Sequence, residues 1–248
     1  MNRTLSIAVA TSALVLTPAC AQERVDTADK AAIEQVVHDY ILEHPEIIEE
    51  ALIKLTERQQ VEEQEQAAEM ILANMDAIYE NDGDYSVGPE DAPVTVVEFF
   101  DYRCGYCKST TAWATTLPAK YDDQVRVIFK EMPILSAESE KAAFAALAAG
   151  KQGKYLEMHL GLMALDNKTG FGPEEIDRVA EEAGVDVTLM RADMKSIQIQ
   201  KHVADTKSLA RTLLISGTPN FMVGTVQINR ADPDAVESLI DAEIQKLS

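Results

Sequence analysis

The sequence predicts an α/β fold, and two patterns support this prediction. A run of β-branched and aromatic residues at 94–100 is followed by a helical stretch and then by a second such run at 125–129. A strand, a helix and a strand of these lengths form a βαβ unit, whose two strands run parallel. A long apolar stripe at helical spacing precedes this unit, so we expect a helical arm ahead of the α/β domain.

The first 21 residues differ from the rest of the chain. Arg3 is their only charged residue, the stretch 5–16 is apolar, and small residues lie before Gln22. This pattern is typical of a cleaved export signal covering residues 1–21. The alternative is lipidation at Cys20, because the run at 16–20 resembles a lipoprotein processing site.

Residues 22–84 are predicted to form a helical arm and linker. Apolar residues recur every three or four positions from 29 to 55, with a break expected at His44-Pro45, and the stripe resumes from 70 to 78 after a polar stretch. A helical arm cannot bury such a stripe against itself, so we expect the arm to oligomerise the protein. The alternative is that the stripe packs on the arm's own domain.

Residues 85–248 are predicted to form the catalytic domain. After the βαβ unit, glycines separate several helical stretches, strand-like runs follow, and a helix closes the chain. The predicted helices are 139–149, 155–165, 173–183, a long one from about 188, and 233–247, and the late strands are 220–223 and 225–228.

The net charge and the cysteines limit the function. A formal net charge of −20 at pH 7 argues against a nucleic-acid partner. Loss of the signal would leave Cys104 and Cys107 as the only cysteines. In an oxidising compartment such a pair either forms a bridge or works as a redox couple.

Cys104-Gly105-Tyr106-Cys107 lies between the first predicted strand and its helix. At a helix start, unpaired backbone N–H groups and the helix dipole favour thiolate over thiol, and the thiolate is the attacking species. We therefore expect Cys104 to attack and Cys107 to resolve the mixed disulfide.

Metal binding is the rival use of the two sulfurs. Tetrahedral zinc needs about four ligands, and the histidines are scattered more than fifty residues from the pair, as expected of ordinary surface or partly buried side chains. We expect no bound metal or cofactor. A two-cysteine Cu(I) site is the alternative. The four histidines are His38, His44, His159 and His202.

Four further residues are candidates for supporting the cysteines. Glu98 interrupts an apolar strand, where a carboxylate is costly without a partner or a role, and Lys130 at the end of the next strand is its candidate partner. A buried Glu98 would exchange a proton with Cys107. Thr218-Pro219 before the late strand is a candidate cis bond that holds a loop against the disulfide. The alternatives are an exposed Glu98 and an ordinary turn proline.

These residues resemble the DsbA family of periplasmic thioredoxin-fold oxidoreductases. The resemblance rests on 98–107, on the helical stretch between Lys130 and Ser216, and on 217–219. It implies a thioredoxin-like fold with a helical insertion at about 134–214. It also implies that Cys104 is the nucleophile, Cys107 its buried partner, Pro219 the cis proline and Glu98 the buried acid.

The differences from DsbA indicate an isomerase. Gly105-Tyr106 and Thr218 are the choices seen in disulfide isomerases such as DsbC, and the acidic helical N-terminus resembles the ScsC-like branch, which includes trimeric isomerases linked to copper tolerance. The resemblance implies action on misfolded or reduced exported proteins and reduction by a membrane donor of the DsbD or ScsB type. A DsbA-like oxidase and a copper-binding protein are the alternatives.

Overall fold

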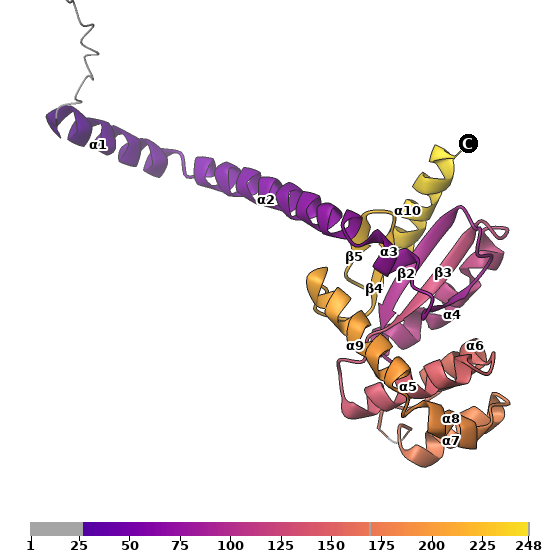
Figure 1. Ribbon diagram of the computed structural model, residues 1–248. Helices are drawn as coiled ribbons and strands as arrows, with labels where there is room; N and C mark the ends of the chain where they lie inside the picture. The colour runs from indigo at the N-terminus through magenta and orange to yellow at the C-terminus, as the bar shows by residue number, and fades with distance from the viewer. Residues whose placement is uncertain (1–26, 169, 248) are drawn as a thin grey trace, which may run out of the picture. The chain divides into compact units, whose positions relative to one another are not determined.

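The computed structural model describes residues 27–168 and 170–247 (Figure 1). The predicted export signal and the alternative lipidation site at Cys20 lie outside these residues. The chain divides into two compact units, residues 1–57 and 58–248. None of the helices in the described ranges is long and apolar enough to cross a membrane.

The first unit consists of α1 (Thr27–Glu43) and the start of α2 (Glu46–Leu72). The break at His44-Pro45 is where the sequence predicts it, because the proline has no N–H and disfavours helical geometry at the residue before it. The apolar stripe is exposed in the single chain. Its exposed members include Ile33, Val36, Val37, Tyr40, Leu42, Ile48, Leu52, Ile53 and Leu55.

The second unit is built on a five-stranded sheet in the order β1-β3-β2-β4-β5. The strands are β1 (Tyr85–Val87), β2 (Val94–Phe100), β3 (Val125–Glu131), β4 (Asn220–Val223) and β5 (Val226–Ile228). β2 and β3 run parallel, as predicted, and are connected by α4 (Gly105–Lys120). The other neighbouring strands are antiparallel. This is the thioredoxin-like α/β arrangement.

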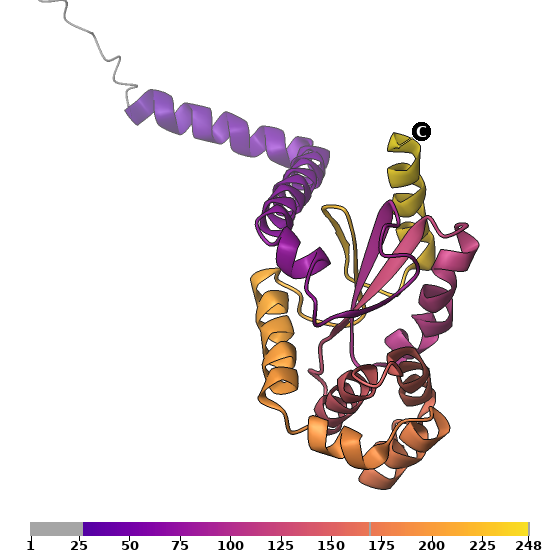
Figure 2. The same cartoon turned by 45° about the vertical axis from the view of Figure 1, so that its right-hand side comes forward.

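The two faces of the sheet bury different sets of side chains. Figures 1 and 2 show α4 on one side of the strands and α9 (Ile197–Thr212) on the other. Val96, Phe100 and Phe129 share one core with both cysteines. Phe99 and Ile128 belong to a second core on the opposite face. The alternation follows from the two-residue repeat of a strand.

A helical insertion separates β3 from β4. It contains α5 (Ala137–Gly150), α6 (Tyr155–Ala164), α7 (Pro173–Glu182), α8 (Val187–Asp193) and α9, and α10 (Pro233–Lys246) follows β5. The predicted single helix from about residue 188 is wrong. It is two helices, because Ser196 caps α9 by accepting a hydrogen bond from the backbone N–H of Ile199.

The second unit extends further toward the N-terminus than the predicted boundary at residues 84 and 85. Ile71 near the end of α2 and Ile78 in α3 (Met75–Tyr79) are fully buried in the second core. The Tyr79 hydroxyl donates to the carbonyl of Gly224 at 2.7 Å. The stripe that resumes after the polar stretch therefore packs on the sheet.

Candidate active site

Cys104 lies at the N-cap of α4, with extended backbone angles of φ −75° and ψ 117°. Its side chain is 7% exposed, whereas Cys107 one turn later is completely buried, and both are free thiols. As a thiol, Cys104 Sγ donates to the carbonyl oxygen of Thr218 at 3.1 Å. Both cysteines are thus buried, and Cys104 is the one that retains a small exposed area.

The pKa of Cys104 is lowered to about 5. The largest cause is a hydrogen bond from the Cys107 thiol. The Thr218 side chain and the backbone N–H groups of Cys107 and Tyr106 add to it, while burial opposes the shift. A cysteine at a helix N-terminus receives this support because the first N–H groups have no partner within the helix. Cys104 is therefore ionised at neutral pH.

The pKa of Cys107 is shifted in the opposite direction. Burial raises the pKa of its thiol, and the hydrogen bond given to Cys104 and the charge of Glu98 raise it further. The two sulfurs thus differ strongly in acidity. Only the ionised sulfur attacks a disulfide, so Cys104 is the nucleophile that the geometry favours.

The two residues that follow Cys104 lie at the surface. Tyr106 is 72% exposed, and a Cβ added at Gly105 would meet no atom within 4 Å. The Thr218–Pro219 peptide bond is cis and leads into β4. Its carbonyl oxygen at residue 218 is in contact with the attacking sulfur.

Glu98 is 1% exposed, and its Oε1 has no hydrogen-bond partner among the described residues. Burial raises the pKa of this carboxyl to about 8, and the charge of Cys104 contributes. The predicted alternative of an exposed strand position is therefore wrong. A buried carboxyl that titrates near neutral pH on the face of the cysteines is suited to proton exchange with Cys107.

Lys130 is not the partner of Glu98, and that prediction is wrong. Lys130 pairs with Phe99 in the β2–β3 register, so its side chain lies on the opposite face of the sheet from Glu98. Its Nζ donates to the Ala77 carbonyl at 2.6 Å and forms a buried ion pair with Asp84. Lys130 therefore anchors the segment before β1 and lies outside the redox site.

Sequence reasoning missed a buried polar cluster on the cysteine face. Glu131 Oε1 accepts hydrogen bonds from the hydroxyls of Tyr102 at 2.9 Å and Tyr155 at 3.0 Å. His159 Nδ1 lies 3.2 Å from the Tyr102 hydroxyl, and burial lowers the pKa of this histidine to about 3. The expectation of a surface or partly buried His159 is wrong. The sequence signal was Glu131 itself, a second acid in an apolar strand.

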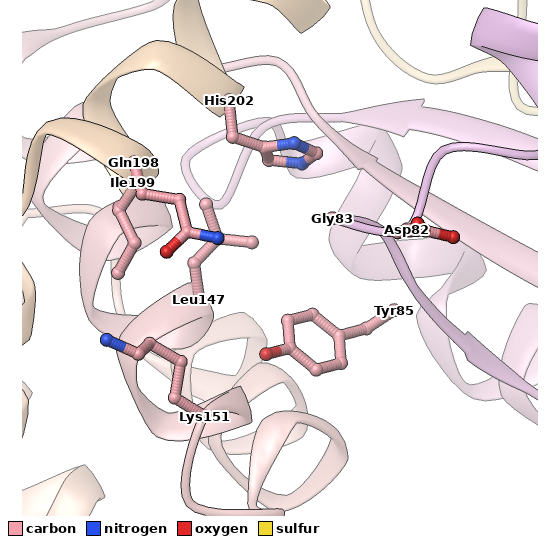
Figure 3. Close-up of a pocket in the computed structure, with 8 residues that line it drawn as sticks. All are labelled: Asp82, Gly83, Tyr85, Leu147, Lys151, Gln198, Ile199 and His202. Atoms are coloured by element: carbon pink, nitrogen blue, oxygen red, sulfur yellow. The ribbon is translucent and has the colours of Figure 1, made fainter.

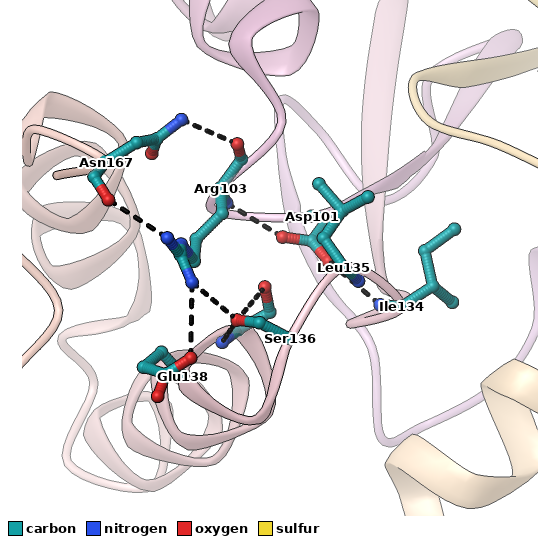
Figure 4. Close-up of polar contacts among 8 residues, drawn as sticks. Asp101, Arg103, Ile134, Leu135, Ser136, Glu138 and Asn167 are labelled. Atoms are coloured by element: carbon teal, nitrogen blue, oxygen red, sulfur yellow. Dashed lines mark hydrogen bonds and ion pairs between the residues drawn. The ribbon is translucent and has the colours of Figure 1, made fainter.

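The loop that precedes Cys104 is fixed by polar contacts (Figure 4). The Asp101 carboxylate accepts backbone hydrogen bonds from Arg103 at 2.8 Å and from Ile134 and Leu135, both at 2.9 Å. Asp101 is 1% exposed. Three N–H donors hold this carboxylate, so the approach to Cys104 has a defined shape.

A cavity of about 160 Å³ lies apart from the cysteines, among β1, α5 and α9 (Figure 3). Figure 3 shows Tyr85, Lys151 and His202 around it. His202 Nε2 is 3.1 Å from the Oδ1 of Asp84, the partner of Lys130. This cavity therefore borders the Lys130 anchor, and neither Cys104 nor Cys107 lines it.

Two family models match the chain. The model described as "Thioredoxin" matches residues 80–242, and the model described as "Copper resistance protein ScsC N-terminal domain" matches residues 29–64. The first covers both cysteines, the helical insertion and the cis proline. The second covers most of α1 and the first part of α2.

Solved structures show the same similarity. A thioredoxin-like oxidoreductase from Silicibacter pomeroyi is 33% identical, with a TM-score of 0.62 over 68% of this chain and 97% of that chain. Proteus mirabilis ScsC in a transitional conformation is 27% identical, with a TM-score of 0.65 over 89% of this chain and 99% of that chain. The similarity to ScsC thus extends beyond the catalytic domain.

Among curated proteins, the Na(+)/H(+) antiporter NhaA 3 of Salinispora tropica is 33% identical over 144 residues. The match covers 57% of this chain but only 22% of the antiporter, so the chain spans about a fifth of the length of that relative.

Proposed function

Since this chain belongs to the thioredoxin family of the matched model and resembles its DsbA and ScsC members, we propose that it is a disulfide isomerase acting on exported cysteine-containing proteins. The observation that carries the proposal is the unequal pair of sulfurs. Cys104 has a pKa lowered to about 5 at a helix N-terminus, and Cys107 is protected behind it with a raised pKa.

In the proposed reaction, the Cys104 thiolate attacks a disulfide of the client. A Cys104–client bond forms, and one client sulfur leaves as a thiolate. A second client thiolate then attacks this mixed disulfide and restores Cys104, so the client's disulfides are rearranged without net oxidation or reduction. Alternatively, Cys107 attacks the mixed disulfide, which reduces the client and leaves a Cys104–Cys107 disulfide.

Glu98 has a part in the second route. Cys107 must lose its proton before it attacks the mixed disulfide, and burial, which raises the pKa of its thiol, opposes this. Glu98 lies on the same face of the sheet, and its carboxyl, with a pKa of about 8, is the buried base in the fraction that is ionised at neutral pH. The Cys104–Cys107 disulfide that results requires a dithiol donor, and we propose a membrane thiol reductase of the DsbD or ScsB type.

The residues beside the pair favour an isomerase over a strong oxidant. A DsbA-like enzyme has a histidine between its cysteines, and an imidazole there stabilises the reduced thiolate. This chain has Gly105-Tyr106, which lacks that group. A reduced form with less stabilisation makes its disulfide a weaker oxidant, which suits an enzyme kept reduced.

The arm supports the same function. Its exposed stripe matches the ScsC N-terminal domain model, and we propose that it joins several chains, in a trimer by analogy with the ScsC-like branch. Several catalytic domains on one assembly raise the effective concentration of thiolate near a client's disulfides.

Light scattering tests this proposal. The double variant Val36→Glu with Tyr40→Glu should show dissociation of the oligomer into single chains. Gln59→Glu with Gln66→Glu, exposed on the polar stretch, is the matched control.

The cysteine assignment is tested with a scrambled disulfide substrate. Cys104→Ser should abolish its refolding, whereas Cys107→Ser should accumulate mixed disulfides, because attack survives and intramolecular resolution does not. Refolding by Cys104→Ser at the wild-type rate would contradict the assignment.

Thr218→Val should shift activity from isomerisation toward oxidation. Stoichiometric Cu(I) retention without turnover would favour the copper-binding alternative.

We also propose that the protein is exported to the periplasm with its mature chain beginning at Gln22. The intact mass of the exported protein tests this, since lipidation at Cys20 would add acyl chains and tether the protein to a membrane.

A further inference from the structure

Two basic residues flank the attacking sulfur in sequence and contact the same segment of the insertion. Arg103 donates through Nη2 to the Asn167 carbonyl at 3.0 Å and through Nη1 to the Ser136 hydroxyl at 3.0 Å. Asn167 Nδ2 donates back to the Arg103 carbonyl at 2.7 Å (Figure 4). The residue before Cys104 is thus tied to the segment that follows α6.

Lys108 contacts the same segment from the other side of the redox turn, residues 104–107. It follows Cys107 directly in the first turn of α4, and its Nζ donates to the carbonyls of Met163 at 2.9 Å and Leu165 at 2.6 Å. These carbonyls lie at the end of α6, where helix carbonyls have no intrahelical partner and the dipole is negative. Lys108 therefore caps α6 while belonging to α4.

One aromatic ring lies beside both cations. Lys108 Nζ is 5.0 Å and Arg103 Cζ is 5.9 Å from the centroid of Phe171, which is 5% exposed. Cations at these distances are attracted to the ring face. The contacts of Lys108 are thus two carbonyl dipoles and a ring, and none of them removes its charge.

The charge of Lys108 is poorly neutralised by its surroundings. No ion pair among the described residues includes Lys108, whereas Arg103 pairs with Glu138 at 3.2 Å. Asp166 and Asp101 attract the ammonium over a longer range, and ionised Cys104 also favours its charged form, although burial lowers the pKa of Lys108 overall. The charged or titratable groups around the redox turn are Glu98 on β2, Asp101 and Arg103 in the following loop, Cys107 and Lys108 on α4, and Asp166 after α6.

We propose that Lys108 is a positioning residue for the Cys104 thiolate. Lys108 lies four residues after Cys104 on α4, and its ammonium, held on the last carbonyls of α6, attracts ionised Cys104 and so favours the ionised form. The inserted helical domain thereby contributes to the acidity of the redox pair. The inference rests on the proposed function only in taking Cys104 as the reactive sulfur.

The pKa of Cys104 in the reduced full-length protein tests this, read from the ultraviolet absorbance of the thiolate. Lys108→Gln retains hydrogen-bond donors for the carbonyls and removes the charge, and it should raise the Cys104 pKa by about half a unit to one unit. Lys108→Arg keeps the charge and should restore the wild-type value. Lys120→Gln removes the same charge at the far end of α4 and should leave the Cys104 pKa unchanged.

The glutathione equilibrium gives a second readout. Less favourable ionisation destabilises the reduced form, so Lys108→Gln should shift the equilibrium about three- to tenfold toward the protein disulfide, following one decade per pKa unit. An unchanged Cys104 pKa in Lys108→Gln, an equal rise in Lys120→Gln, or an equal rise in Lys108→Arg would overturn the proposal. Loss of isomerase activity does not enter either readout, so a failure of the proposed function is separately visible.

Discussion

Replacing Glu98 with glutamine should stabilise the protein at neutral pH, although Glu98 is a candidate catalytic group. The carboxyl is buried with one oxygen unpaired, and burial raises its pKa from 4.5 to about 8. Glutamine has nearly the same shape and carries no ionisable proton. The substitution therefore removes the titration and leaves the packing nearly unchanged.

The magnitude follows from the two pKa values. Between pH 4.5 and pH 7 the unfolded chain releases the Glu98 proton while the folded chain retains it, so wild-type stability falls as the pH rises through this window. About 2.5 pH units at 1.36 kcal/mol per unit give about 3 kcal/mol at pH 7. The penalty is absent below pH 4.5 and complete above about pH 8.

Urea unfolding of the reduced protein at pH 4 and pH 7 measures this difference. Glu98→Gln should match the wild type at pH 4 and exceed its free energy of unfolding by about 3 kcal/mol at pH 7. Glu90→Gln, at an exposed position in the same unit, should differ from wild type by less than about 0.5 kcal/mol at both pH values. An equal effect of Glu98→Gln at the two pH values would refute the raised pKa.

The same variant should resolve mixed disulfides more slowly, by about a hundredfold or more if Glu98 is the base for Cys107.

Three other changes test separate parts of the structure. Lys130→Met should cost about 3–5 kcal/mol in urea unfolding because it leaves Asp84 buried without its cation, and adding Asp84→Asn should recover part of the loss. Gly150→Ala should cost about 1–3 kcal/mol, since the new Cβ would lie 2.1 Å from the Tyr85 ring; an unchanged melting temperature would contradict this packing. Alkylation of Cys104 should be nearly independent of pH above about pH 6 and slow tenfold per unit below pH 5, because its thiolate is lost as the pH falls through about 5; a midpoint near 9 would indicate an ordinary thiol.

The main strands and most helices were predictable because each has a local signal. Continuous β-branched runs identify β2 and β3, and the proline at 45 identifies the break between α1 and α2. β1 was missed because its three residues lie between turn-forming residues at 81–84 and 88–89. The burial of Ile71 and Ile78 was also missed, because a helical stripe shows that a face is buried and does not show against which partner.

The parts of the site that lie in short contiguous motifs were predictable. The cysteine pair and the Thr218-Pro219 sequence are contiguous, and their placement on α4 and before β4 follows from the order of elements. The partner of Lys130 was not predictable, because it depends on which face of the strand the residue occupies. The Glu131 cluster was missed for a related reason, since it joins β3 to Tyr155 in a helix 24 residues later in sequence.

The register of β2 and β3 makes the lengths of these strands more constrained than their composition. A conservative substitution at one position changes one side chain, but a deletion or insertion of one residue reverses the direction of every side chain beyond it. In β3 such a change would direct Lys130 into the core beneath the cysteines and turn Glu131 away from Tyr102. We therefore expect length variation among natural homologues of this domain to be concentrated in the connections between elements and to be rare within these two strands.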